Sequence, residues 1–212
     1  DQPRSRGLGD VYKRQLLSRV VAQNHQGPGG QKSVLKKPGS TSICYNGQLS
    51  KDTEATQAAA LAVDAHTLFL LGPFYFQPSG TVFVMNGESK VDDELCDEVL
   101  AILRPGFGVA DEDRVVLYVD RSTKQLRRVR MTLNGLDSTR GSEVDVTFRA
   151  FRRIGGVLWP TDFDERVRSP FDLQAHHWNL LGLEINRGLR PADLNLGRWT
   201  AKAAKPTAAL SR

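Results

Sequence analysis

Apolar and polar residues alternate along the chain from Arg114 to Asn186, in runs that are separated by Gly, Asp or Ser. A period of two, with turn signals about every eight to twelve residues, predicts antiparallel strands. The runs are RVVLYVD (114–120), QLRRVRMTLNG (125–135), EVDVTFRAFRRIGG (143–156), VLWPTDFDERV (157–167) and a last strand over 173–188. We therefore expect a mainly β (α+β) protein, an antiparallel up-and-down meander with one apolar and one polar face.

One segment, from Ser50 to Leu71, has helical periodicity instead. Ser50 or Asp52 is placed to cap a helix, and Gly72-Pro73 is placed to end it. The apolar stripe at spacing i, i+3, i+4 and i+7 consists of Ala58, Leu61, Ala62, Ala65, Leu68 and Phe69. We expect this amphipathic helix to lie on the sheet or to cover its open side as a lid.

The rest of the chain supplies further strands and loops. Residues 16–31 end in a loop, and residues 32–47 predict two strands that close on the tight-turn pair Asn46-Gly47. Further short strands are expected over 81–88 and 94–106, and a loop over 105–113. We expect one domain over residues 16–200 and a loosely ordered tail over 201–212.

The first fifteen residues need a separate interpretation. Asp10–Gln15 (DVYKRQ) resembles the in-frame translation of a transposon end sequence that is used in preparing sequencing libraries. We interpret residues 1–15 as a joining sequence and exclude them from the fold. The alternative is a native short strand. The interpretation implies that the original N-terminus, with any signal peptide, is missing.

Composition sets few limits. The net charge is +5, of which residues 1–15 supply two, and the small remainder does not indicate a nucleic-acid partner. No uninterrupted apolar run approaches the roughly twenty residues that span a bilayer. Cys44 and Cys96 have no metal-ligand spacing; they either pair in an oxidising compartment or, the favoured alternative, are two separately buried thiols.

Alternation assigns side chains to the two faces of the meander. Val129, Met131 and Leu133 share a side, as do Val144, Val146, Phe148 and Ala150 in the next strand. On the polar side, Arg128 and Arg130 are expected to face Glu143 and Asp145 and to form a solvated surface. Trp159 and Phe163 share a side, and Pro160 suggests a bulge or an edge. Alternation does not separate a packed core from a cavity lining for these aromatic residues.

Candidate catalytic and metal-binding groups are few. His176 and His177 are adjacent on a strand and point to opposite faces, so one metal does not readily take both. Asp64 and His66 do not share a helix face. The acids of residues 111–113 read as a solvated turn rather than a cation site, and of Asp162, Asp164 and Glu165 only the two aspartates share a side. Nucleophile-elbow, phosphate-loop, zinc-protease and dinucleotide motifs are absent from the sequence. We expect no enzyme activity, no cofactor and no metal.

Two stretches resemble a known superfamily. LYVDRSTKQLRRVRMT contains a strand, an Asp-x-x-Thr turn and a basic strand, and VTFRAFRRIGGVLWPTDF follows it. Together they are similar to the LolA-like superfamily of lipoprotein-localisation carriers and outer-membrane lipoprotein-sorting proteins, over Val115 to Val167 and weakly at 45–47. The resemblance implies an unclosed half-barrel under a helical lid, an apolar hollow that receives acyl chains, and a secretory signal.

Three hypotheses follow, in order of preference. The first is a periplasmic carrier or chaperone, peripheral to the membrane at most, that binds lipid or lipoprotein acyl chains; envelope transport proteins are further possible partners. Helix 52–71 would close the hollow and swing at Gly72-Pro73. The expected lining is Leu68, Phe69, Phe74, Phe76, Val129, Met131, Val146, Phe148, Trp159 and Phe163. The second hypothesis is a non-enzymatic interaction module with a packed core. The third is a hydrolase that uses His66, His176 or the acids of 111–113.

Overall fold

The computed structural model describes residues 11–15, 19–27, 30–76 and 81–196. Contacts within the chain define two compact units, residues 1–59 with 184–212, and residues 60–183. The single domain over 16–200 stays a prediction. The predicted tail over 201–212 lies outside the described residues.

The first unit contains a five-stranded antiparallel sheet in chain order. Its strands are β1 (Val11–Gln15), β2 (Val20–Gly27), β3 (Gly30–Lys37), β4 (Ser40–Tyr45) and β5 (Gln48–Leu49). The Asn46-Gly47 turn is confirmed, with φ of 50° and 84°. The loop expected at the end of 16–31 is wrong in part, because β2 pairs along its length with β3. β1 agrees with the alternative of a short strand, and the joining-sequence interpretation stays a prediction.

A small core holds this unit together. Val20 and Ala22 of β2 pack with Leu194, beyond the short helix η3 (Pro191–Asp193), and Leu35 and Leu189 border them. The chain from Leu189 to Leu194 therefore packs against this sheet.

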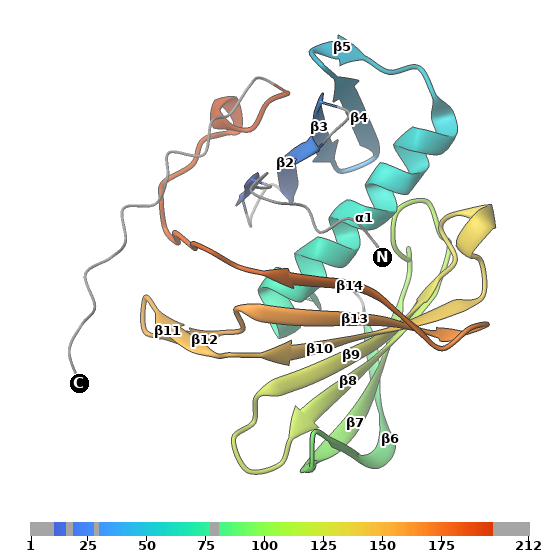
Figure 1. Ribbon diagram of the computed structural model, residues 1–212, viewed down its shortest axis with the longest axis vertical. Coiled ribbons are helices and arrows are strands. Elements are labelled where there is room, and N and C mark those ends of the chain that lie inside the picture. The colour runs from blue at the N-terminus through green and yellow to red at the C-terminus, as the bar shows by residue number, and fades with distance from the viewer. Residues whose placement is uncertain (1–10, 16–18, 28–29, 77–80, 197–212) are drawn as a thin grey trace. The chain divides into compact units, whose positions relative to one another are not determined.

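The second unit is built on a seven-stranded antiparallel sheet with the order β14-β13-β10-β9-β8-β7-β6 (Figure 1). Its strands are β6 (Val82–Val91), β7 (Glu94–Leu103), β8 (Asp113–Asp120), β9 (Leu126–Leu133), β10 (Ser142–Arg149), β13 (Asp162–Ser169) and β14 (Leu173–Asn179). The order follows the chain, so the predicted meander is confirmed. In the described residues β6 and β14 are edges that do not pair with each other, and the half-barrel is therefore unclosed.

Two strand predictions need correction. The run 143–156 is not one strand: β10 ends at Arg149, Ala150 has a φ of 50°, and a separate hairpin follows, β11 (Arg152–Ile154) and β12 (Val157–Trp159). The last strand ends at Asn179 rather than at residue 188. In both cases the alternation continues past the point at which the backbone leaves the sheet.

Helix α1 (Thr53–Leu71) ends at the predicted residue, begins at Thr53 within the predicted segment 50–71, and is followed by the short helix η1 (Gly72–Phe76). The Asp52 carboxylate accepts a hydrogen bond from the Ala55 amide at 3.0 Å, which makes Asp52 the N-cap. The helix is buried on two sides rather than along one stripe, because Val63 and Thr67, on the side opposite Leu61 and Leu68, are also buried.

The segment Thr53–Phe76 is long and apolar enough to cross a membrane, with a mean hydropathy of 1.3 in its best window. However, 56% of that window is buried inside the protein, as expected for a core helix. The search of the sequence for about twenty consecutive apolar residues did not identify this helix as long and apolar enough to cross a membrane.

Candidate functional site

The face of the seven-stranded sheet that packs against α1, here called the inner face, is apolar. Leu61, Ala65, Leu68 and Phe69 of the helix lie in one buried cluster with alternate residues of β7, β8, β9, β10 and β13. Such burial excludes water from the contact between helix and sheet and supplies most of the stability of a helix of this kind.

Aromatic rings form the centre of this cluster. Phe69 of the helix lies 6.5 Å from the Phe148 ring centroid and 5.9 Å from that of Trp178. Phe163 stacks on Trp178 at 3.9 Å and meets Phe148 edge to face at 5.6 Å. His66 packs on the edge of the same group, 5.7 Å from Trp178. The group joins the helix to β10, β13 and β14.

Most of the expected lining residues meet in this buried cluster. They are Leu68, Phe69, Phe76, Val129, Met131, Val146, Phe148 and Phe163, each at most 6% exposed. Phe74 lies outside the cluster and is 45% exposed. Trp159 does not continue strand β13 beside Phe163 as expected; it lies in the β11–β12 hairpin, where its Nε1 donates to the Ile154 carbonyl.

Phe107 and Trp178 are two aromatic residues of this region that were not selected from the sequence. Phe107 is fully buried although it lies in the loop between β7 and β8, and it packs 5.9 Å from Tyr75. Trp178 follows His176 and His177, and in that segment the two histidines were considered for metal binding. Alternation along β14 could have placed Trp178 on the inner face, whereas a lone Phe in a Gly/Pro loop carries no periodic signal.

The loop that contains Phe107 also fastens the helix. The Gly108 amide donates to the Asp64 carboxylate at 2.7 Å. Gly108 has a φ of +62°, and a Cβ there would lie 2.9 Å from the Leu61 amide nitrogen. The close approach of the loop to the helix therefore requires glycine.

Part of the inner face is not covered by the helix. Along edge strand β6, Phe83 is 50% and Met85 is 65% exposed, and Phe74 of η1 is 45% exposed. Phe83 meets the buried ring of Phe76 edge to face at 5.6 Å. Phe83 is therefore continuous with the buried cluster, and we call the exposed residues Phe74, Phe83 and Met85 the open rim.

Charged residues follow the open rim toward the β6–β7 turn. Arg121 pairs with Glu88 at 2.5 Å and with Asp97 at 2.6 Å, and hydrogen bonding to Asp97 raises the pKa of Arg121. By the alternation of β6 and β7, these carboxylates point to the same face as Met85. The uncovered part of the inner face is thus apolar beside η1 and polar at its other end.

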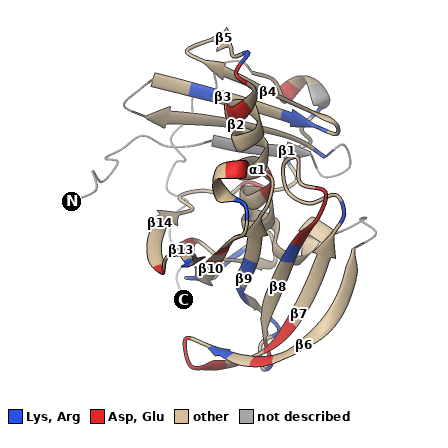
Figure 2. Cartoon of the chain, turned by 90° about the vertical axis from the view of Figure 1, so that its right-hand side faces the viewer, with Lys and Arg blue, Asp and Glu red and all other residues tan. Residues whose placement is uncertain are grey.

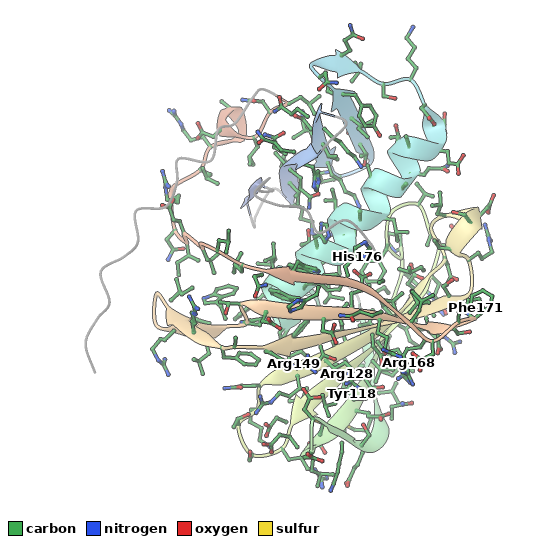
Figure 3. All side chains as sticks on the ribbon, in the orientation of Figure 1. Tyr118, Arg128, Arg149, Arg168, Phe171 and His176 are labelled. Carbon is green, nitrogen blue, oxygen red and sulfur yellow. The ribbon has the colours of Figure 1, made fainter. Side chains whose placement is uncertain are left out.

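Charged residues occur along strands β7, β8 and β9 (Figure 2). Those that alternate with the apolar residues of the inner face point to the opposite side of the sheet, here called the outer face. Arg130 lies opposite Asp145 as predicted, and its Nε and Nη2 donate to the two carboxylate oxygens at 2.7 and 2.9 Å. Arg128 lies opposite Thr147, and its Nε donates to the Thr147 hydroxyl at 2.9 Å, while its Nη1 lies 3.9 Å from the Asp145 carboxylate. Tyr118, Arg128 and Arg149 lie on this side, whereas His176 lies toward α1 (Figure 3).

This polar surface is more buried than a solvated face. Asp145 is 5% and Tyr118 is 5% exposed, and both Arg128 and Arg130 lie about 6 Å from the Tyr118 ring. The Asp145 hydrogen bonds raise the pKa of Arg130, and burial raises that of Tyr118. A shallow depression of about 200 Å³ on this side is lined by Asn86, Leu100, Arg114, Val116, Arg130, Met131, Thr132 and Glu143.

The Asp-x-x-Thr turn between β8 and β9 is held by one carboxylate. Asp120 accepts hydrogen bonds from the amides of Ser122 and Thr123 at 2.8 and 2.9 Å, and from Arg127 at 2.8 Å. The Thr123 amide and Arg127 hold the pKa of Asp120 well below its usual range.

The two adjacent histidines have separate carboxylate partners. His176 contacts Glu165 at 2.9 Å on the inner face, and His177 contacts Asp162 at 2.9 Å on the outer face. Their opposite orientation is confirmed, and so is the shared side of Asp162 and Asp164, which both belong to the outer face.

The acids of residues 111–113 do not act as a group. Glu112 pairs with Arg104, whose hydrogen bond lowers the pKa of Glu112. Asp113 is fully buried and accepts hydrogen bonds from the Phe107 amide and the Thr132 hydroxyl, both at 2.8 Å. Burial raises the pKa of Asp113, which is therefore a structural acid rather than part of a solvated turn.

The cysteines are separately buried free thiols, as the favoured alternative predicted. Cys44 belongs to the unit of residues 1–59 and Cys96 to that of residues 60–183. Burial raises the pKa of Cys96, so its thiol stays protonated and unreactive at neutral pH.

Solved structures include proteins that are similar to this open antiparallel half-barrel with one helix on its apolar face. The alignment with a DUF1329 family protein from Desulfovibrio piger covers 89% of this chain and 83% of that protein's chain, with 12% sequence identity and a TM-score of 0.50. The alignment with a LolA superfamily protein from Nitrosomonas europaea covers 79% of this chain and 74% of that protein's chain, with 12% sequence identity and a TM-score of 0.50.

A third solved structure, an outer membrane lipoprotein-sorting protein domain from Vibrio parahaemolyticus, matches 83% of the chain over 80% of its own, with 11% identity and a TM-score of 0.45. No protein-family model and no curated protein matches the chain. At these identities the likeness concerns the fold: the chain has a LolA-like fold, as the resemblance at 115–167 predicted.

Proposed function

We propose that this protein is a carrier or chaperone of the bacterial envelope that binds acyl chains of lipids or lipoproteins on the inner face of its half-barrel. The observation that carries the proposal is the open rim. Phe74, Phe83 and Met85 are 45–65% exposed, and Phe83 continues directly into the buried apolar cluster through its contact with Phe76. Exposed apolar side chains in one place commonly mark a binding surface.

The open rim suits an acyl chain because its apolar side chains lie beside η1 and a charged group lies further along β6, toward the β6–β7 turn. Each methylene that is removed from water contributes about 0.8 kcal/mol, so a short stretch of chain on Phe83 and Met85 gives useful affinity. The charged group of Arg121, Glu88 and Asp97 lies beyond the apolar part and remains suited to a polar head group.

The bound chain would extend from the open rim toward the cluster beneath the helix. The deeper lining in this proposal is Leu68, Phe69, Phe76, Val129, Met131, Val146, Phe148 and Phe163. Access to it requires local separation of η1 from β6 rather than a swing of the whole helix, because Asp64 and the aromatic contacts of Phe69 hold the helix to the sheet. Trp159 lies in the β11–β12 hairpin and is a less suitable lining residue.

The same proposal places the protein in the periplasm as a non-enzymatic carrier, whose partners are acyl chains and, in addition, envelope transport proteins. It rests on the LolA-like fold together with the open rim. A hydrolase is a weaker candidate, because His176 is paired with Glu165, Glu112 with Arg104, and Asp113 with backbone and hydroxyl groups.

A second candidate, an interaction module with a packed core, is favoured by one observation. Val129, Phe163 and Leu68 are fully buried and in contact with neighbours, so the cluster is well filled. In that case the open rim would contact a protein partner and no acyl chain would enter.

Native mass spectrometry of the protein, followed by titration with a fluorescent fatty acid, separates the two candidates. The test variant is F83S/M85S, and the matched control is F171S/L173S, which removes two apolar side chains that are 71% and 47% exposed at the β13–β14 turn. We expect co-purified lipid or fatty-acid uptake that is lost in F83S/M85S and retained in the control. A protein that takes up no fatty acid would support the packed module instead, and equal uptake by the two variants would refute the open rim as the acyl site.

A further inference from the structure

The β11–β12 hairpin is a projection from the sheet. It is inserted between neighbouring strands β10 and β13, pairs with neither, and extends beyond their ends (Figure 1). Gly155 and Gly156 have φ of 58° and 84°, as a tight type I′ turn requires. Three residues per strand correspond to about 10 Å of extension.

Hydrogen bonds at the base hold the hairpin in place. The Thr161 amide donates to the Arg149 carbonyl at 3.1 Å, and the Thr161 hydroxyl donates to the Ala150 carbonyl. The Trp159 indole donates to the Ile154 carbonyl at 3.2 Å, across the two strands. An isolated two-stranded hairpin is marginally stable in water, so these contacts matter for its shape.

The side chains of the hairpin are apolar or basic. Val157 and Leu158 are each 39% exposed, and Ile154 and Trp159 are half-buried. Arg152 and Arg153 are exposed, and acidic residues are absent from 150–160. The hairpin therefore combines aliphatic side chains, an indole and two positive charges.

The two arginines differ from the others in residues 60–183. Within the part of the chain that the structure describes, every other arginine of this unit lies within 4 Å of a carboxylate: Arg104, Arg114, Arg121, Arg127, Arg128, Arg130, Arg140, Arg149, Arg166 and Arg168. Arg152 and Arg153 have no such ion pair there; Arg153 instead donates to the Gly156 carbonyl at 2.7 Å. Their charges are thus not neutralised by neighbouring acids.

From these features we infer that the hairpin docks on the surface of a bilayer that contains anionic lipids. Exposed aliphatic residues with Trp at their side insert shallowly at the interface, where an indole is favoured. Uncompensated arginines near an anionic surface each contribute about 1 kcal/mol, so their charge is complementary to phosphate head groups. The inference does not depend on acyl binding at the open rim.

Vesicle sedimentation tests the inference with the full-length protein. The probes are vesicles of phosphatidylcholine alone and vesicles of phosphatidylcholine and phosphatidylglycerol in equal parts, at low and high salt. We expect binding to the anionic vesicles that weakens with salt, and weak binding to the neutral ones. R152Q/R153Q should reduce the partition coefficient by about 25-fold, fivefold for each charge, and V157S/L158S by roughly tenfold.

The matched control is R104Q/R140Q, which removes the same charge from arginines that are 69% and 67% exposed and paired with acids at the opposite ends of the strands. It should bind anionic vesicles like the unaltered protein. Equal losses in R152Q/R153Q and in the control would show unspecific electrostatic attraction and overturn the inference. The same holds if the unaltered protein binds neither kind of vesicle. Circular dichroism shows that each variant is folded, and fatty-acid uptake at the open rim should be unchanged in all of them.

Discussion

The contact between the β7–β8 loop and helix α1 yields a sharp prediction at Gly108. This residue has a φ of +62°, and a Cβ built on it would lie 2.9 Å from the amide nitrogen and 3.1 Å from the Cα of Leu61. Both atoms belong to the helix backbone and do not move aside as a flexible side chain would. Gly108→Ala therefore has two separate costs.

The first cost is conformational: an L-residue in the left-handed region is disfavoured by about 1–2 kcal/mol. The second is steric: overpacking in a well-packed region costs about 1–3 kcal/mol. We expect Gly108→Ala to lower the free energy of unfolding by about 2–5 kcal/mol, a large part of the 5–15 kcal/mol that is typical of a domain.

Gly141→Ala separates the two costs. Gly141 has a φ of +78°, and nothing lies within 4 Å of a Cβ built there, so only the conformational cost applies. Urea unfolding followed by circular dichroism gives both free energies, and Gly108→Ala should be the less stable variant by about 1–3 kcal/mol. Equal stability of the two variants would mean that the loop does not lie against the helix backbone, and the argument for a fixed helix would be lost.

Three further predictions concern the core, the loop and a turn. Phe148→Ala should lower the free energy of unfolding by about 3–5 kcal/mol, because the ring is 2% exposed between Phe69 and Phe163; a loss below 1 kcal/mol in urea unfolding would contradict a packed cluster. Asp64→Ala removes the acceptor of the Gly108 amide and should cost about 1.5–3 kcal/mol, with faster amide hydrogen exchange at Gly108 as the check. Asp120 has a lowered pKa, so its stabilising contribution is present above the unfolded-state value of about 3.9 and is lost as the pH falls through the folded-state value. Asp120→Asn should therefore be less stable at neutral pH and lose less stability below about pH 4; a parallel pair of curves would refute this assignment.

Local pattern was sufficient wherever one face of an element is buried and the other is polar. In β9 and β10, Val129 pairs with Val146 and Met131 with Val144, all four on the one face to which alternation assigned them. A slip by one residue would bring Arg130 into the apolar core, which explains why the sequence specifies this register so firmly. The same is true of α1, which begins directly after the N-cap Asp52 and ends directly before Gly72, where the backbone has a positive φ of 53°.

Local pattern failed where the backbone changes direction without a change in composition. The residues from Ala150 to Trp159 continue the alternation of β10, yet a positive φ at Ala150 turns them into a separate hairpin and removes Trp159 from the sheet. Phe107 illustrates the opposite failure, because a loop residue with no periodic neighbours becomes a fully buried part of the core.

The candidate site likewise contains residues that local pattern predicted and residues that it did not predict. Alternation and helical spacing were enough to select Val129, Val146, Phe148 and Phe69 as residues that share one buried cluster. The open rim could not be predicted, because the exposure of Phe83 and Met85 depends on where the helix ends relative to edge strand β6.

The sequence by itself thus determined the elements, their polar and apolar faces and the antiparallel meander, because these depend on interactions between residues that are close in the chain. The tertiary structure decided which apolar residues are covered, that Asp64 holds the loop at Gly108, and that Arg152 and Arg153 project on a hairpin without acidic partners. These features depend on packing between segments far apart in the chain, and a periodic pattern carries no information on which distant segment covers a given face.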